Sequence, residues 1–546
     1  LERLENSAAL LGEVERLAGA GEWTPLYDRL TPYVLGMEQA PGLKNMKKRL
    51  TGEHKDAVKT RADEAAKLFE KIEDLISCSL DEAELDRKAA EPCLRALFAA
   101  VRDFDARFAA RKRERRLLEF SDFEHFALRL LRSPDGTGVL AGITNVSNVI
   151  GYDKRPDGTI APIPGRLVYR GIDIDTLAAA ADAHDRFMFE EVVWLLLFGA
   201  LPTQEQYARF CKLIDEHREL PKGFADDMIM NSPSPNIMNK LQRCVLGLYS
   251  YDDRAEDLSL ENILNQSINL IASMPTMMVN AYQMKRRYYD KQSMFFHLPK
   301  PGQSTAEHIL STYRPDQKFT HEEAKLLDMC LLVHADHGGG NCSTFTARVL
   351  SSSGTDTYSA IAAAIGALKG PKHGGANLMV NRQLKDILKH VENPEDDDEV
   401  REYLRRILRK QAGDGSGLIY GMGHAVYTIS DPREVILKQR ARHLAYDKGF
   451  EEEYNMLCSI ERLAPGIFAE EKGSTKPVCA NVDLFSGLIY NMLGISEDIY
   501  TPLFAIARVP GWCAHRVEEV VFANRIIRPA YKYLGVRQKY KPIEER

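Results

Sequence analysis

Three short stretches, far apart in the chain, each place histidine among glycines: His334-Ala-Asp-His337-Gly-Gly-Gly-Asn341, Gly370-Pro-Lys-His373-Gly-Gly-Ala-Asn377 and Gly421-Met-Gly-His424-Ala-Val-Tyr. Glycine lets the backbone approach a ligand closely and adopt turns that other residues disfavour. A histidine held in this way is better placed for a ligand than for a hydrophobic core. We therefore take His337, His373 and His424 as candidates for chemistry.

A carboxylate and several cations follow the third stretch. Asp483 lies in Asn481-Val-Asp483, and the arginines of interest are Arg433, Arg508 and Arg528. An aspartate can take a proton from carbon, and an imidazole can donate a hydrogen bond to a developing oxyanion. Guanidinium groups pair with carboxylates through two parallel hydrogen bonds. The set predicts an enzyme that handles a multiply charged carboxylic acid and moves one proton at carbon.

Plainer interpretations exist for single residues. His334, Asp336 and His337 have a spacing that can bind a metal ion, but no third ligand follows at the spacing of a metalloenzyme, so we expect no metal. His334 is expected to be a structural residue at a helix end. Asp483, taken alone, would also suit the N-cap of the helix that follows it. Its occurrence together with His373 and His424 favours catalysis.

These stretches, in this order, resemble the citrate synthase family, which condenses an acyl-CoA with oxaloacetate. The resemblance covers about residues 133–546. It also includes Asp135-Gly-Thr-Gly-Val, Pro164-Gly-Arg-Leu-Val-Tyr-Arg170-Gly, Leu195-Leu-Leu-Phe-Gly-Ala-Leu-Pro202-Thr and Ile527-Arg-Pro529.

The resemblance implies three catalytic roles. Asp483 would be the base that removes a proton from the carbon next to the thioester. His373 would donate a hydrogen bond to the thioester oxygen, and His424 would donate one to the ketone of oxaloacetate. A thioester methyl group is a very weak carbon acid, so the base and the donors are needed together.

The resemblance also implies how oxaloacetate is bound. His337, Arg433 and Arg508 would contact it, and Arg528 would reach it from a second subunit. The active site would then be complete only in a homodimer. Oxaloacetate and acyl-CoA are the expected partners, whereas nucleic acid and membrane are not.

The acyl-CoA is expected to lie against the loop before His424. By resemblance this loop comprises Leu418, Ile419, Tyr420, Gly421, Met422 and Gly423. Thr428 stands where the family often has a basic residue, which removes one expected phosphate contact. No G-x-G-x-x-G signature calls for NAD, and no tightly bound cofactor is expected. The acyl donor stays open: acetyl-CoA would give citrate, and propionyl-CoA would give 2-methylcitrate.

Composition limits the class of protein. The chain has 546 residues, 44% of them hydrophobic and 27% charged, with a formal net charge of -6, which offers no general attraction to nucleic acid or to an anionic membrane. Its nine cysteines show no C-x-x-C spacing and favour a reducing, cytoplasmic location. The longest apolar run, Val192 to Leu201, is too short to span a bilayer. The acidic residues near the start disfavour a transit peptide.

The fold is expected to be all-α. Apolar residues at helical spacing predict helices over Phe189 to Phe198, Gln204 to His217, Thr320 to Val333, Asp356 to Leu368, Val400 to Gln411 and Asp483 to Leu493. A turn-rich stretch at 151–165 suits a small hairpin, and the turn cluster Ser133 to Gly138 marks a domain boundary. The resemblance implies a large helical domain of 133–373 plus 492–546 and a small one of 374–491.

Residues 1–132 read as a separate helical segment. The sequence from Arg116 to Leu128 resembles, more weakly, a helical part of superfamily-1 helicase and helicase-nuclease subunits of the recombination type. The chain has no G-x-x-x-x-G-K-[ST] phosphate loop, so this segment is not an ATPase by itself. The basic run Arg111 to Arg116 most simply forms a solvated helix face. A nucleic-acid-associated protein with an inactive synthase scaffold is a remote alternative, and an accidental fusion is another.

Overall fold

A computed structural model describes residues 143–155, 159–473, 477–522, 525–529, 540 and 542–545. The chain divides into two units, residues 1–125 and 126–546, and every described residue belongs to the second. The helices expected within 1–132 and the helicase-like stretch lie outside the described residues.

The described part begins with a small antiparallel sheet. Strand β1 (Ser147–Lys154) pairs with β2 (Ile160–Tyr169), which pairs with β3 (Ile172–Asp173). The register of β1 against β2 shifts between Ile150 and Tyr152. The hairpin expected at 151–165 is therefore present, and it extends beyond that range at both ends.

The rest of the described chain is mainly helical, which confirms the all-α class. The helices up to residue 373 are α7 (Ile174–Ala183), α8 (Phe189–Phe198), α9 (Gln204–Glu216), the π-helix η1 (Ala225–Met230), α10 (Ile237–Gly247), the 3-10 helix η2 (Leu248–Tyr251), α11 (Leu260–Tyr288), α12 (Thr305–Tyr313), α13 (His321–His334), α14 (Cys342–Ser352) and α15 (Thr357–Leu368).

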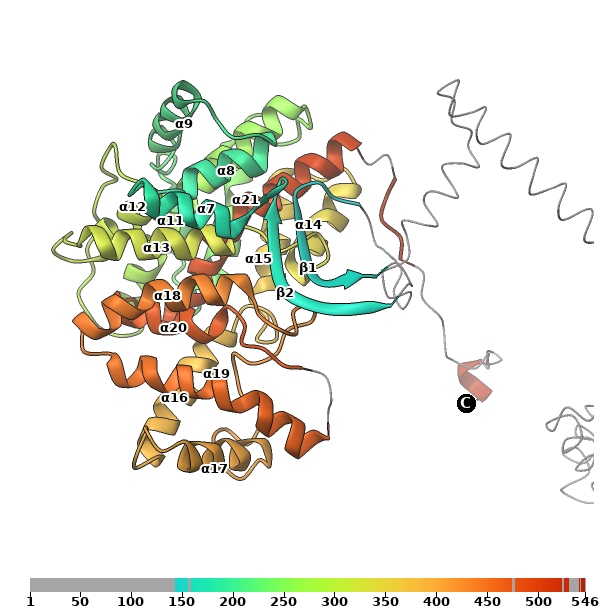
Figure 1. The fold of residues 1–546 in the computed structure, drawn as a ribbon. Coiled ribbons are helices and arrows are strands. Elements are labelled where there is room, and N and C mark those ends of the chain that lie inside the picture. The colour runs from blue at the N-terminus through green and yellow to red at the C-terminus, as the bar shows by residue number, and fades with distance from the viewer. Residues whose placement is uncertain are drawn as a thin grey trace, which may run out of the picture. The chain divides into compact units, whose positions relative to one another are not determined.

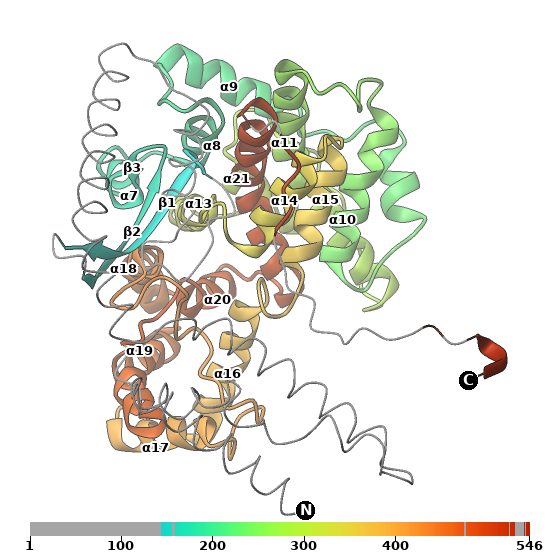
Figure 2. The same ribbon diagram turned by 90° about the vertical axis from the view of Figure 1, so that its right-hand side faces the viewer.

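The later helices carry much of the predicted site. They are α16 (Ala376–His390), α17 (Asp397–Leu408), α18 (Pro432–Asp447), α19 (Glu451–Lys472), α20 (Asp483–Met492), η3 (Glu497–Ile499), α21 (Tyr500–Phe522) and η4 (Ile543–Glu545). In both views α16, α17 and α19 lie at one end of the helical body, and α18 and α20 lie between them and the remaining helices (Figures 1 and 2).

Side-chain caps explain where several helices begin. Thr203 and Gln206 form a capping box at the start of α9, and Thr320 and Glu323 form another at the start of α13. Each box supplies partners for backbone N–H groups that a helix leaves unpaired at its first turn. The predicted helix starts near residues 204 and 320 follow from these signals.

Helix α21 lies at the centre of the core. It packs against α8, α11, α13, α14 and α15. A Cβ atom at Gly511 would collide with the carbonyl of Ala335 and the carboxylate of Asp336. Glycine at this position therefore lets α21 approach the end of α13, where the first histidine stretch begins.

None of the described helices is long and apolar enough to cross a membrane.

Candidate active site

The first and third histidine stretches meet in space. His337 follows α13 and His424 precedes α18, yet their ring centroids lie 5.1 Å apart. The ring of Tyr427 stacks on His424 at 4.5 Å between centroids. Strand β2 supports this loop, because the Tyr427 hydroxyl donates to the Arg166 carbonyl at 3.3 Å and the Gly165 N–H donates to the Ser430 carbonyl at 3.1 Å.

Backbone contacts fix the protonation of His424. Its Nδ1 atom accepts hydrogen bonds from the backbone N–H groups of Val426 at 3.0 Å and Tyr427 at 2.9 Å. A nitrogen that accepts two N–H groups carries no proton, so a neutral ring has its proton on Nε2. Burial, with help from Arg433, lowers the pKa of His424 to about 4. At neutral pH the ring is a neutral donor through Nε2.

Whereas His424 is held through Nδ1, His373 is held through its Nε2 atom. Its Nε2 atom accepts the backbone N–H of Ser343 at 3.3 Å and lies 2.9 Å from the Ser343 hydroxyl, which accepts the indole N–H of Trp512 at 3.2 Å. The ring proton therefore sits on Nδ1. Burial and the charge of Arg508 lower the pKa of His373 to about 4. Neither Trp512 nor Ser343 was selected from the sequence as a site residue.

Asp483 lies beside the His424 loop through a short backbone bridge. Met422 and Ala480 form an isolated antiparallel pair. The Gly423 N–H donates to the Cys479 carbonyl at 2.7 Å, and the Asn481 side-chain amide donates to the Gly423 carbonyl at 2.8 Å. These bonds fix the positions of His424 and the start of α20 relative to each other.

Asp483 is the first residue of α20 and is partly exposed. The N-cap is Val482, so the capping role considered for Asp483 is not the one observed. Burial raises the pKa of Asp483 to about 6, while Arg433 and Arg508 act in the opposite direction. The carboxylate is thus mostly ionised at neutral pH but is a stronger base than an ordinary aspartate.

Arg433 is oriented by Asp431. Its Nε and terminal NH2 groups donate to the two oxygens of Asp431 at 3.0 and 2.6 Å. Asp431 also accepts the backbone N–H of Val482 at 3.3 Å, which ties the start of α18 to the start of α20. Although burial opposes it, Asp431 raises the pKa of Arg433, so this buried guanidinium keeps its charge.

Arg508 has unused hydrogen-bonding capacity. It is 1% exposed on α21, its Nε donates to the His334 carbonyl at 2.6 Å, and its guanidinium lies 4.8 Å from the Phe504 ring centroid. One of its terminal nitrogens and the Nε2 atom of His337 are buried without a hydrogen-bond partner among the described residues. Buried polar atoms are normally paired. Burial lowers the pKa of Arg508 only to about 10, so it remains a cation suited to an anionic ligand.

A buried network holds the His337 loop. One oxygen of Asp336 accepts from the Ser147 hydroxyl and the Gly338 N–H, and lies 3.2 Å from Nε2 of His515. Burial opposes ionisation, but His515 and its neighbours lower the pKa of Asp336 to about 2. His334 instead directs Nδ1 to the Cys330 carbonyl at 2.8 Å. His334 and Asp336 thus have separate hydrogen-bond partners.

Comparison with known proteins identifies the family. A family model described as citrate synthase, C-terminal domain, matches residues 136–530. The chain belongs to the citrate synthase family. Citrate synthase of Synechocystis is 37% identical over 75% of this chain and 92% of the relative. 2-Methylcitrate synthase 1 of Corynebacterium glutamicum is 32% identical over 75% of this chain and 97% of the relative.

Solved citrate synthases have the same fold. The Thermoplasma acidophilum enzyme, solved as a ternary complex with carboxymethyl coenzyme A and oxaloacetate, has a TM-score of 0.61 at 27% identity and covers 74% of this chain and 97% of that chain. The Thermotoga maritima enzyme has a TM-score of 0.59 at 27% identity and covers 75% of this chain and 98% of that chain. The resemblance stated from sequence is therefore confirmed for this part of the chain.

The citrate synthase loop expected to contact acyl-CoA, Leu418 to Gly423, is anchored to α16. The Gln383 side chain donates to the Leu418 carbonyl at 2.9 Å and accepts the Tyr420 N–H at 2.9 Å. Leu418 is exposed and Ile419 is buried. Thr428, at the position where the resemblance led us to expect a basic residue, is also buried.

Arg528 stands apart from the other predicted residues. It is exposed in the stretch 525–529 that follows α21, where the Ile527 N–H donates to the Ser352 hydroxyl at 3.0 Å. Within the described residues of one chain, no hydrogen bond or ion pair joins Arg528 to His337, Arg433 or Arg508. Its expected role requires a second subunit.

Proposed function

We propose that this member of the citrate synthase family condenses acetyl-CoA with oxaloacetate and releases citrate and free CoA. The observation that supports it best is the combination of one carboxylate with a raised pKa, Asp483, and two neutral histidines, His373 and His424, which have opposite ring nitrogens free to donate. Citrate synthases need no tightly bound cofactor, and acyl-CoA enters as a co-substrate.

We propose the following roles for these residues. Asp483 removes a proton from the carbon next to the thioester, and the Nδ1–H group of His373 stabilises the enol or enolate oxygen. The carbon then forms a bond to the ketone carbon of oxaloacetate as the ketone π bond breaks. The resulting alkoxide is stabilised by the Nε2–H group of His424 and takes up a proton, which balances the one that Asp483 removed. Water then hydrolyses the new thioester, which gives citrate and CoA.

Oxaloacetate binding uses the buried cations. Arg508 has a terminal nitrogen without a partner, and His337 has an unpaired Nε2 atom. A carboxylate at this point would satisfy both, and a hydrogen bond to a charged partner contributes about 1.5–3 kcal/mol. Arg433, already oriented by Asp431, is the proposed second anchor for the two negative charges of the substrate.

We also propose that the enzyme is a homodimer and that Arg528 of one subunit completes the site of the other. Its exposure on one chain and its place after α21 support this arrangement. A cytoplasmic location is proposed because all described cysteines are free thiols, and disulfides are rare in reducing compartments.

The smaller domain is proposed to comprise residues 374–491 and to close over the substrates, with residues 133–373 and 492–546 forming the larger one. The grouping of α16, α17 and α19 at one end of the body supports this division (Figure 1). Closure would exclude water while the enol forms.

The activity is tested by steady-state assay of thiol release from acetyl-CoA and from propionyl-CoA, each with and without oxaloacetate. We expect release that depends on oxaloacetate and a higher kcat/KM with acetyl-CoA. A 2-methylcitrate synthase is the second candidate, supported by the similarity to the Corynebacterium enzyme. One methylene in an apolar pocket changes selectivity by only about 1–3 kcal/mol, so the donor has to be measured. A higher kcat/KM with propionyl-CoA would identify the enzyme as a 2-methylcitrate synthase. Absence of oxaloacetate-dependent release with either donor would exclude both.

A further inference from the structure

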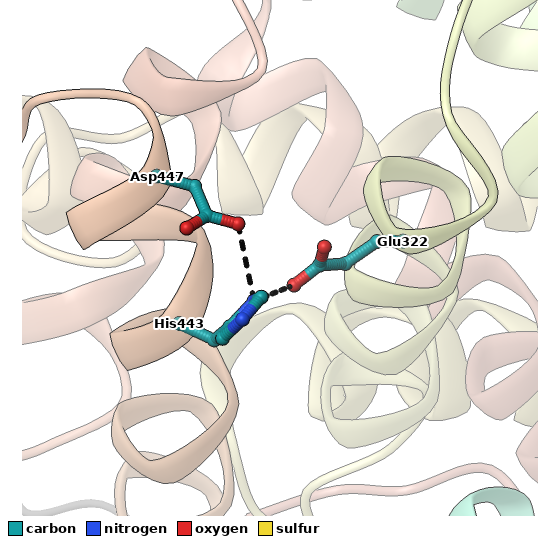
Figure 3. A group of neighbouring side chains, drawn as sticks. All are labelled: Glu322, His443 and Asp447. Carbon is teal, nitrogen blue, oxygen red and sulfur yellow. Dashed lines mark hydrogen bonds and ion pairs between the residues drawn. The ribbon is translucent and has the colours of Figure 1, made fainter.

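A second cluster of ionisable side chains lies on the surface where α13 and α18 pack together. Nδ1 of His443 lies 2.8 Å from a carboxylate oxygen of Glu322 and 3.4 Å from one of Asp447. Figure 3 shows Glu322 reaching from one helix toward His443 and Asp447 on the other. One potential ligand atom from each residue lies within 4.8 Å of the others.

The charges in this cluster are not balanced by lysine or arginine. Two carboxylates converge on one imidazole, and among the described residues neither Glu322 nor Asp447 pairs with any other cation. The nearby cations are engaged elsewhere, since Lys448 pairs with Glu323 and Arg440 pairs with Asp182. Like charges at this separation repel each other unless a cation lies between them. The cluster therefore favours a bound positive charge.

The donor set selects the kind of cation. Zinc binds imidazole nitrogen and carboxylate oxygen at about 2.0–2.2 Å, so ligand atoms around one ion lie about 3–4 Å apart. The two distances to Nδ1 are close to this range. Magnesium and calcium prefer oxygen ligands alone, whereas imidazole suits zinc and its first-row neighbours. The side chains of Glu322, His443 and Asp447 are 46%, 74% and 57% exposed, which leaves room for water as further ligands.

We propose that Glu322, His443 and Asp447 form a site for a divalent transition-metal ion of the zinc type, which joins α13 to α18. Glu322 lies in the first turn of α13, whose other end is His334, and α18 begins near Arg433. At 1.5 Å per residue the ion would lie about 15–18 Å along these helices from Arg433 and His334. The ion is therefore a structural link between α13 and α18. The opposite ends of these two helices lie at the candidate active site. The proposal does not depend on the reaction that the enzyme catalyses.

The test uses the untagged full-length protein, stripped with a chelator and titrated with ZnCl2 by isothermal calorimetry. A pH of about 8 is suitable, because Glu322 and Asp447 raise the pKa of His443 and the imidazole must be neutral to bind metal. His443→Ala removes the nitrogen ligand. His390→Ala is the matched control, since His390 is also exposed and lies 3.4 Å from Asp386 one turn away but belongs to no three-ligand group.

We expect about one zinc ion per chain in the wild type and in His390→Ala, with affinity at least tenfold lower in His443→Ala. Even the loss of a residue outside the ligand set often costs about tenfold in affinity. Zinc should also raise the Tm of the first two proteins and not that of the third, because binding to the native state stabilises it. Co2+ adds a spectroscopic check: absorption from thiolate ligands would assign the ion to cysteine and overturn the proposal. Equal zinc affinity of wild type and His443→Ala, or no binding up to about 0.1 mM free Zn2+, would also overturn it.

Discussion

His373 accepts hydrogen bonds on its Nε2 atom, whereas His424 accepts them on its Nδ1 atom. The protons of the two neutral rings therefore lie on the nitrogens that remain free, Nδ1 of His373 and Nε2 of His424. Both rings can donate without first taking a proton from solvent. Because the pKa of each is about 4, neither is expected to become an imidazolium near neutral pH.

Replacing Asp483 with asparagine should stop proton removal while leaving the substrate anchors in place. We expect Asp483→Asn to lower kcat at least about a hundredfold, within the range for loss of a general base, with a much smaller change in oxaloacetate affinity. Thiol-release kinetics and calorimetric titration of oxaloacetate measure the two effects. Near-normal turnover in a folded variant would show that Asp483 is not the base.

The pH profile should report the same carboxylate. The folded pKa of Asp483 is raised from 3.8 to about 6, and the base must be ionised to act. kcat/KM should therefore be full above about pH 7 and fall roughly tenfold per pH unit well below 6. Circular dichroism at each pH controls for unfolding. A limb centred near 4, or a loss of activity as the pH rises from 6 to 8, would contradict this assignment.

Arg508 and Arg516 provide a matched pair on α21. Both are buried, but the guanidinium of Arg516 already donates to Thr357, Ser351 and the Thr355 carbonyl, whereas Arg508 retains an unpaired nitrogen. We expect Arg508→Lys to raise the KM for oxaloacetate by about tenfold or more, since lysine cannot pair through two parallel bonds. Arg516→Lys should lower the Tm and leave that KM nearly unchanged. The opposite pattern would exclude Arg508 as an anchor.

Substitutions at Gly421 and Gly415 distinguish the effect of steric packing from that of backbone strain in one loop. Both have positive φ, +79° and +74°, but a Cβ at Gly421 would lie 3.0 Å from the Cα of Leu484, whereas one at Gly415 meets nothing within 4 Å. Gly421→Ala should push the His424 loop away from α20 and reduce kcat by about a hundredfold, because misplacement of catalytic groups by about 1 Å has effects of that size. Gly415→Ala should cost only stability, about 1 kcal/mol. Equal kinetic effects would show that strain alone matters.

A shared active site predicts complementation. Arg528→Ala and Asp483→Asn should each be nearly inactive as pure dimers. Random co-refolding of equal amounts makes half of the dimers mixed, and one of the two sites in each mixed dimer has both intact residues. About a quarter of the wild-type activity should return. If both pure variants are inactive, no recovery with mixed dimers demonstrated by mass would mean that Arg528 acts within its own subunit. An active Arg528→Ala dimer would mean that Arg528 has no role in the site.

Local signals in the sequence were enough for many helices but not for the longest ones. Helices α8 and α9 follow the predicted ranges closely, and α9 has a capping box at its start. Three long helices that were not predicted, α11, α19 and α21, each contain an internal proline, Pro275, Pro465 or Pro510. Proline normally interrupts a helix. Here burial of one or more faces of each helix outweighs that local cost.

The candidate site also has a part that local sequence signals indicate and a part that depends on tertiary packing. Glycine-flanked motifs pointed to His337, His373 and His424, the Asn481-Val-Asp483 stretch pointed to Asp483, and the type and order of these motifs carried the family resemblance. Their positioning partners are distant in sequence: Trp512 reaches Ser343 across 169 positions, and Ser147 reaches Asp336 across 189. No local pattern marks such pairs, because they depend on how α14, α21 and the hairpin pack. The proposed role of Arg528 likewise depends on a subunit interface.

The backbone pairing of Met422 with Ala480 brings together the two ends of the segment that contains α18 and α19. Gly423 and Asn481 are 58 residues apart but directly bonded, so the backbone leaves the active site and returns to the same place. A second contact joins the two ends of this segment, because the Val482 N–H donates to the Asp431 carboxylate. The spacing of His424 and Asp483 is therefore set by these local hydrogen bonds and not by the distal turns of α18 and α19. Substitutions in those distal turns should change the surface of the enzyme more than its chemistry.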